Sequence, residues 1–172
     1  MSEKNYVNPA FTFSEVEAIQ DLYQDSCVFN TIAGGDLKIT PNDFLDQFKL
    51  IKEEFKELEV GIENGDPVEQ LDGCIDILVT VFGYMQKMRN AYGIDIGKAM
   101  QLVAENNLSK FPVSELLARH TVDMYKQQGI ETNYSFNKDY EVYVIRDSKT
   151  NKVKKPIGFN SVDLVQTFPT LH

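Results

Sequence analysis

Residues 52–83, KEEFKELEVGIENGDPVEQLDGCIDILVTVFG, decide the fold, because they contain both arms and the turn of a predicted helical hairpin. Apolar side chains recur every three to four residues on both sides of Asn64-Gly65-Asp66-Pro67, which predicts two helices. Asn-Gly is typical of a helix end, and Asp followed by Pro caps and begins the next helix. So short a connection makes the two helices antiparallel neighbours.

Two pairs of acidic residues lie in this hairpin, one pair on each predicted helix. Glu54 and Glu57 are three residues apart, and Asp72 and Asp76 are four apart, so each pair shares one helix face. Antiparallel packing then lets the two pairs face each other across the helix interface. Unpaired carboxylates beside apolar residues are costly to bury, and a hard divalent cation is their natural partner. The pattern predicts a metal-dependent reaction on an anionic substrate.

Other acidic residues of the hairpin have simpler explanations. Glu53, Glu59 and Glu63 are expected mainly to be solvated, as most glutamates are. Glu69 lies three residues after the predicted N-cap Asp66, so a capping box is favoured over metal binding for it.

The remaining sequence predicts three more helices and a β-hairpin. The hairpin is expected to pair EVYVIR, across the polar turn DSKTN, with a strand around Val153. The expected fold class is mainly α, an antiparallel helical bundle that forms one domain with a small β-appendage. The expected ranges are 14–30, 95–107 and 114–129 for the helices, 140–165 for the hairpin and 1–172 for the domain.

Composition excludes several function classes. A net charge of −9 over 172 residues argues against a broad electrostatic footprint on nucleic acid or on an anionic membrane. Two histidines disfavour di-iron bundles, zinc hydrolases and a Ser-His-Asp triad. Cys27 and Cys74 are too few for a disulfide framework and are expected to be small buried side chains. With no signal-peptide pattern in MSEKNYVNPAF and no long apolar run, a cytoplasmic location is expected.

A second group of polar residues is a candidate for substrate binding. Asn107 and Lys110 lie one turn apart at the end of a predicted helix, which suits contacts with phosphate or ribose oxygens. Taken alone, a polar helix end is the simpler explanation for them. Tyr92 is a candidate for stacking on a base, although a packing role is favoured, and Gln47 is a further candidate for contacts with the base.

The order of these elements resembles the all-α NTP pyrophosphohydrolase superfamily, in its MazG-like and phosphoribosyl-ATP pyrophosphohydrolase-like branch. The family pattern is E-x-x-E on one helix, E-x-x-D on the next helix and a later N-x-x-K element. Glu54-x-x-Glu57 matches the first part and Asn107-x-x-Lys110 the last, and the segment KVKKPIGF is similar to the C-terminal part of that branch. The resemblance covers about residues 44–164.

The chain departs from the family pattern at one position. With Asp76 taken as the family's aspartate, the glutamate position of E-x-x-D holds Gly73. Asp72, on the same helix face as Asp76, is the expected substitute. The alternative register uses Glu69 and Asp72, but the following apolar run favours Asp76.

The resemblance implies the reaction (d)NTP + H₂O to (d)NMP + pyrophosphate, in nucleotide-pool control or removal of unwanted nucleotides. It implies a homodimer or homotetramer, and Mg²⁺, with Mn²⁺ as a possible substitute. Glu53 or Glu54 would orient or deprotonate the attacking water, and Lys110 would stabilise charge on the phosphates. The implied metal ligands are Glu54, Glu57, Asp72 and Asp76.

Two other interpretations stay open. A non-catalytic helical module that binds nucleotides or assembles would keep the fold without the chemistry, and Gly73 favours it. Phosphoribosyl-ATP pyrophosphohydrolase itself is disfavoured by the additional N-terminal helix and the β-segment. The sequence does not predict which base or sugar is preferred.

Overall fold

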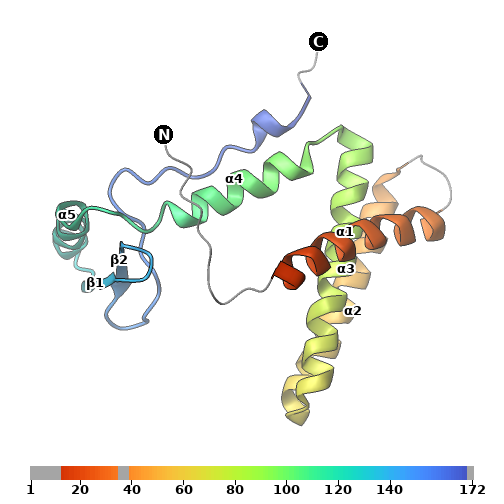
Figure 1. Ribbon diagram of the computed structural model, residues 1–172, viewed down its shortest axis with the longest axis horizontal. Coiled ribbons are helices and arrows are strands. Elements are labelled where there is room, and N and C mark those ends of the chain that lie inside the picture. Colours follow the sequence, from red (N-terminus) through yellow and green to blue (C-terminus); the bar gives the residue numbers. More distant parts are fainter. Residues whose placement is uncertain (1–12, 35–38, 170–172) are drawn as a thin grey trace. The chain divides into compact units, whose positions relative to one another are not determined.

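The computed structural model describes residues 13–34 and 39–169, which form five α-helices and an antiparallel two-stranded hairpin (Figure 1). The expected mainly α class with a C-terminal hairpin is thereby confirmed. The chain divides into two compact units, Met1–Ile94 and Asp95–His172. The expectation of one domain stays a prediction. None of the helices in the described ranges has both the length and the hydropathy that crossing a membrane requires.

The first unit contains α1 (Phe13–Gly34), α2 (Pro41–Asn64) and α3 (Pro67–Tyr92). α2 and α3 form the expected antiparallel hairpin, and α1 lies across α3 (Figure 1). The end of α2 and the start of α3 fall where the sequence predicts them. Proline occupies the first position of both helices, and both end at a glycine in the left-handed conformation, Gly65 with φ 65° and Gly93 with φ 68°.

The turn between α2 and α3 is closed by main-chain and side-chain hydrogen bonds. The N–H groups of Gly65 and Asp66 donate to the carbonyls of Ile62 and Gly61, at 3.1 and 3.0 Å. Asp66 Oδ1 accepts from the N–H groups of Val68 and Glu69, at 2.9 and 3.3 Å. Asp66 therefore satisfies two donors that the first turn of α3 leaves without helical partners.

Replacing Asp66 by alanine should lower the free energy of unfolding by about 1 kcal/mol, because the N-cap bonds are lost. Urea unfolding followed by far-UV circular dichroism measures this. Glu63→Ala, at an exposed position near the end of α2, is the matched control and should have little effect. Equal stability of the Asp66 variant and the wild type would show that the cap contributes nothing.

α2 and α3 approach each other closely at glycines. A β-carbon on Gly73 would lie 3.1 Å from both Cα and Cβ of Leu58, and one on Gly61 would lie 3.1 Å from the main-chain nitrogen of Gln70. Both distances are shorter than ordinary carbon contacts. A side chain at either position would therefore push the helices apart.

Buried amides hold the three helices of this unit together. Gln47 on α2 is 4% exposed and donates from Nε2 to the carbonyl of Thr80 on α3, at 2.9 Å. Gln86 on α3 donates to the carbonyl of Cys27 on α1, at 3.0 Å. A polar side chain that is buried needs such partners, so these bonds fix where α1 and α2 meet α3.

The second unit contains α4 (Ile96–Leu108), α5 (Glu115–Gln127), β1 (Thr132–Asn137), β2 (Val142–Asp147) and the 3-10 turn η1 (Val165–Thr167). α5 packs on both strands, and Ala118, Thr121 and Ile145 are fully buried. The chain after β2 runs back past α5 to α4. Thr121 Oγ1 accepts from the Ile157 N–H at 3.1 Å, and the Asp95 N–H donates to the Thr167 carbonyl at 3.0 Å.

The predicted β-hairpin has a different main partner strand. β2 matches the expected strand, but its main partner is β1, which precedes it, with Tyr134 opposite Ile145. Val153 forms only an isolated bridge with Arg146. Asp147 Oδ1 accepts from the N–H groups of Lys149 and Thr150, and this turn returns the chain to β2, where the Lys154 N–H donates to the Ile145 carbonyl at 2.8 Å.

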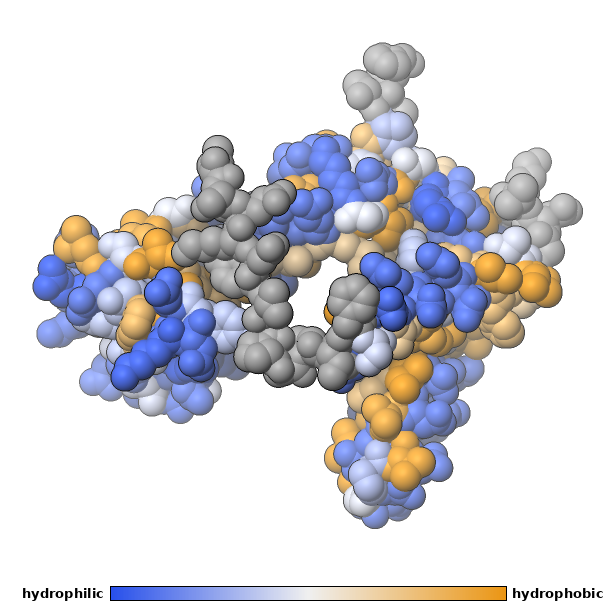
Figure 2. Space-filling view, in the orientation of Figure 1, coloured by the Kyte–Doolittle hydropathy of each residue, from blue (hydrophilic) through white to orange (hydrophobic). Residues whose placement is uncertain are grey.

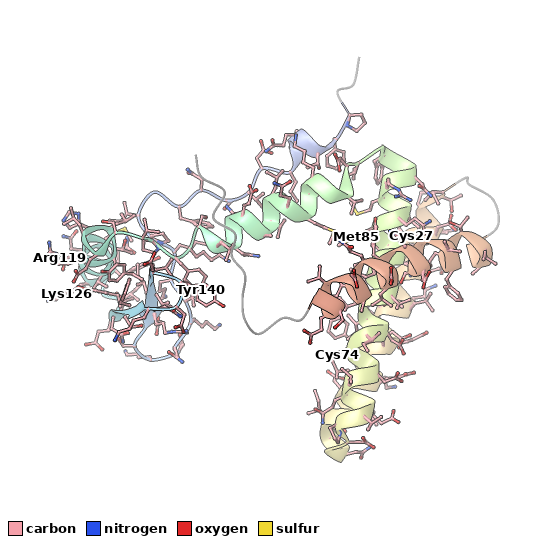
Figure 3. The ribbon with its side chains drawn as sticks, in the orientation of Figure 1. Cys27, Cys74, Met85, Arg119, Lys126 and Tyr140 are labelled. Carbon is pink, nitrogen blue, oxygen red and sulfur yellow. The ribbon has the colours of Figure 1, made fainter. Side chains whose placement is uncertain are left out.

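The expectation of two buried cysteines is also wrong. Both thiols are free; Cys27 on α1 is half-buried, and Cys74 on α3 is exposed (Figure 3). Cys74 follows Gly73, which contacts α2, so its side chain points about 100° further round the helix and away from that contact.

Candidate functional site

Carboxylates from both arms of the hairpin meet around Glu54. The Glu54 side chain is half-buried at the margin of the contact between α2 and α3. Its pKa lies above the ordinary value for glutamic acid, first because of burial and then because of nearby negative charge. The acids responsible, in decreasing order of effect, are Glu57, Asp76, Glu53 and Asp72.

This electrostatic neighbourhood contains all four predicted metal ligands. Asp72 and Asp76 act on Glu54 from α3, across the helix interface, and Glu57 acts on it from one turn further along α2. Asp76 is half-buried, whereas Glu57 and Asp72 are exposed. Carboxylate oxygens are the donors that Mg²⁺ and Mn²⁺ prefer, so the chemistry of the donor set fits such an ion.

The carboxylates are not gathered into a closed cage. Over residues 13–34 and 39–169, no three His, Cys, Asp or Glu side chains lie close enough together to hold a metal ion as they stand. Like charges keep such groups apart. Coordination of one ion therefore requires rotation of the longer side chains, Glu54 and Glu57, towards α3.

A surface groove of about 520 Å³ lies beside these acids, near the turn end of the hairpin. Three acidic residues reach it: Glu53 and Glu57 from α2, and Glu69 from α3. Lys56 and Asn64 contribute the other polar groups of its lining. Neither Lys56 nor Asn64 was predicted as a site residue from the sequence. Lys56 lies three residues after Glu53, so the helical spacing used for the acids would have found it.

The structure gives Gly73 a packing role. Because a β-carbon at this position would lie 3.1 Å from Cα and Cβ of Leu58, a side chain there requires the two helices to shift by a few tenths of an ångström. Glycine at position 73 therefore suits the close packing of α2 on α3. Asp72, one position earlier, keeps an acid near Glu54 without entering the contact between the helices.

The capping-box interpretation of Glu69 is wrong. Asp66 is the N-cap, as predicted, but its own N–H donates to the Gly61 carbonyl at 3.0 Å and so has no need of the Glu69 carboxylate. The Glu69 side chain is exposed and lines the groove with Glu53 and Glu57.

Two predicted substrate contacts in the first unit have packing roles. Gln47 is buried and bonded to the Thr80 carbonyl. Tyr92 is 51% exposed, and its ring stacks on that of Phe44 with centroids 5.8 Å apart and planes 16° apart. The packing role favoured for Tyr92 agrees with this contact, and base recognition by either residue stays a prediction.

The predicted phosphate contacts belong to the second unit. Lys110 Nζ donates to Asn107 Oδ1 at 2.7 Å at the end of α4, and neighbouring Asn106 donates to the carbonyl of Asn160 at 2.7 Å. Asn107 and Lys110 therefore form one polar pair, as their spacing predicts. Their action together with the carboxylates of α2 and α3 stays a prediction.

The chain matches no protein-family model, no curated protein and no solved structure in comparisons with each. The likeness to the all-α NTP pyrophosphohydrolases therefore rests on the residues quoted from the sequence. The function that this likeness implies is a proposal, and the arrangement of those residues in the hairpin supports it.

The raised pKa of Glu54 gives a pH-dependent test of this site without substrate. The folded chain holds the Glu54 proton more tightly than the unfolded chain, so stability falls as pH rises from the ordinary carboxyl pKa through the raised one. Glu54→Gln removes the ionisable carboxyl group and with it this loss of stability. The variant should be more stable than the wild type at pH 7 without metal, and the difference should shrink as pH is lowered through that window.

Thermal unfolding in metal-free buffer at several pH values measures this difference. Glu59→Gln, at an exposed position on the same helix, is the matched control and should show no such pH dependence. Adding Mg²⁺ or Mn²⁺ should raise the Tm of the wild type more than that of Glu54→Gln. A Glu54 variant that is less stable than the wild type at pH 7 without metal would contradict the electrostatic account.

Proposed function

We propose that this chain is a divalent-metal-dependent nucleoside triphosphate pyrophosphohydrolase, which converts a (d)NTP and water to a (d)NMP and pyrophosphate. The observation that carries the proposal is that half-buried Glu54 lies within the electrostatic reach of Glu57 on its own helix and of Asp72 and Asp76 on α3, whose charges add to burial in raising its pKa. Like charges placed on facing helices beside a half-buried carboxylate cost stability, and such an arrangement is more frequent at functional sites. The match of their spacing to the family pattern supplies the reaction class.

The proposed roles follow from where each side chain lies. Glu54, Glu57, Asp72 and Asp76 would hold Mg²⁺ or Mn²⁺, which when bound would neutralise the phosphates of the substrate. Glu53 is exposed at the groove beside them, so it can meet a water molecule that enters from solvent. Glu53 or Glu54 would orient that water or take its proton.

Lys110 would stabilise negative charge on the phosphate chain, with Asn107 holding its amine in place. Gln47 and Tyr92 are the proposed contacts with the rest of the nucleotide. The substrate is a free nucleotide, so we place the reaction in the cytoplasm, in control of the nucleotide pool or removal of unwanted nucleotides.

A non-catalytic nucleotide-binding or assembly module is the second candidate. Two observations favour it: the acidic position of the family pattern is occupied by Gly73, and the carboxylates in the described ranges are not gathered around one point. Such a module would bind nucleotide without turning it over.

A pyrophosphate-release screen over all common NTPs, dNTPs and phosphoribosyl-ATP, with Mg²⁺ and Mn²⁺ in parallel, tests the proposal. Metal-dependent release from at least one nucleoside triphosphate, abolished by EDTA, is the expected result. Release from phosphoribosyl-ATP alone would favour the histidine-pathway enzyme. No release from any substrate, with nucleotide binding seen by calorimetry, would favour the non-catalytic module.

A further inference from the structure

A single basic residue lies among the acids of the groove at the turn end of the hairpin. Lys56 is the only lysine or arginine among the described residues that line this groove of about 520 Å³. It follows Glu53 by one helical turn and directly precedes Glu57. Its side chain is exposed, and the ammonium group of a lysine is a compact donor that binds phosphate oxygens.

The amine of Lys56 differs from those of the other two lysines on α2. Lys49 forms an ion pair with Asp46 at 2.7 Å, and Lys52 Nζ lies 4.6 Å from the centroid of the Phe48 ring. Lys56 forms no ion pair in the part of the chain that the structure describes, although three acids line the same groove. Its charge therefore remains available to an anion that enters the groove.

The proposed nucleotide contacts follow one order along the hairpin. Gln47 lies seven residues before Glu54, about 10 Å along the axis of α2, and Tyr92 stacks on Phe44 at the same end. The groove lies on the other side of Glu54 and extends to Asn64 at the turn. Figure 2 shows hydrophilic surface at this lower end of the hairpin. The base, the reacting phosphate and the terminal phosphates of a (d)NTP have the same order.

We infer, on the basis of the proposed function, that the groove holds the two terminal phosphates of the substrate, which leave as pyrophosphate, and that Lys56 binds them. Glu57 is both a proposed metal ligand and part of the groove lining, so phosphates in the groove lie beside the metal site. The acids of the lining repel free phosphate, and pyrophosphate therefore binds together with Mg²⁺. Lys56 adds a direct contact that a substrate with fewer phosphates does not complete.

Calorimetry of the full chain with pyrophosphate and Mg²⁺ tests this contact without turnover. The wild type should bind, and Lys56→Gln should bind roughly tenfold more weakly, because one charge-assisted hydrogen bond is lost. Lys56→Arg keeps the charge and should bind nearly as well as the wild type. Lys52→Gln removes the same charge one turn earlier on α2, outside the groove lining, and as the matched control should bind like the wild type.

Product inhibition gives a second measurement in the active protein. Lys56→Gln should raise the inhibition constant of pyrophosphate roughly tenfold and leave that of the nucleoside monophosphate unchanged. A general loss of structure would weaken both products together. Circular dichroism checks that each variant is folded.

A wild type that does not bind pyrophosphate with Mg²⁺ would overturn the inference. Equal weakening by Lys56→Gln and Lys52→Gln would overturn it too, since only the net charge of α2 would then matter. The pyrophosphate-release screen tests the proposed function separately. Binding that depends on Lys56 in a chain without turnover would support the groove contact and contradict the enzymatic activity, whereas turnover with binding that ignores Lys56 would do the reverse.

Discussion

Asp76→Asn should lower the rate of pyrophosphate release by about 100-fold or more, while leaving the metal-free protein at least as stable as the wild type. Asparagine keeps the shape of the side chain but removes the charge that acts on Glu54 across the helix interface. The lost charge removes a proposed metal ligand and also relieves repulsion. Activity and stability therefore change in opposite directions, which a mere loss of folding cannot produce.

Steady-state pyrophosphate release and thermal unfolding in metal-free buffer measure the two effects on the same preparation. Asp46→Asn, on α2 at an exposed position paired with Lys49, is the matched control and should leave turnover unchanged. If the Asp76 variant turned over substrate at the wild-type rate, Asp76 would not be a metal ligand. A variant that loses activity and stability together would assign Asp76 a structural role.

Gly73→Glu, which restores the acid of the family pattern, should lower the free energy of unfolding by about 2 to 3 kcal/mol and should not improve catalysis. Even the first carbon of the new side chain would lie 3.1 Å from Cα and Cβ of Leu58. Main-chain atoms in the middle of a helix cannot rotate away, so α2 and α3 must separate. Separation also moves Asp72 and Asp76 away from Glu54.

Cys74→Glu is the control for this variant, because it adds the same charge one position later at an exposed site. It should cost little stability. Urea unfolding compares the two variants with the wild type. If Gly73→Glu were as stable as Cys74→Glu and turned over substrate faster, the close contact between Gly73 and Leu58 would not limit the side chain at position 73.

The helical part of the fold could be predicted because its signals are local. Asp66-Pro67 and Gly93 set the bounds of α3 through cap geometry that involves only neighbouring residues. Thr40-Pro41 does the same for the start of α2. The three-residue and four-residue spacings also identified acids that act on Glu54, since helical periodicity alone decides which side chains share a face.

The features that could not be predicted depend on contacts between distant segments. Gly73 was expected as a missing ligand, but its role is set by the distance to Leu58 on another helix. The main partner of β2 was misassigned because β2 contacts both flanking segments, β1 along its whole length and the segment after the Asp147 turn only at the bridge between Arg146 and Val153. Lys56 was overlooked although its helical spacing from Glu53 places it on the same face, and it lines the groove with Glu53 and Glu57.

The most direct test of the account is ³¹P NMR of the products formed from an active (d)NTP with Mg²⁺. We expect nucleoside monophosphate and pyrophosphate in equal amounts, no orthophosphate, no product with EDTA, and product formed about 100-fold more slowly or less with Asp76→Asn. Nucleoside diphosphate and orthophosphate, or product formed equally well without a divalent ion, would contradict it.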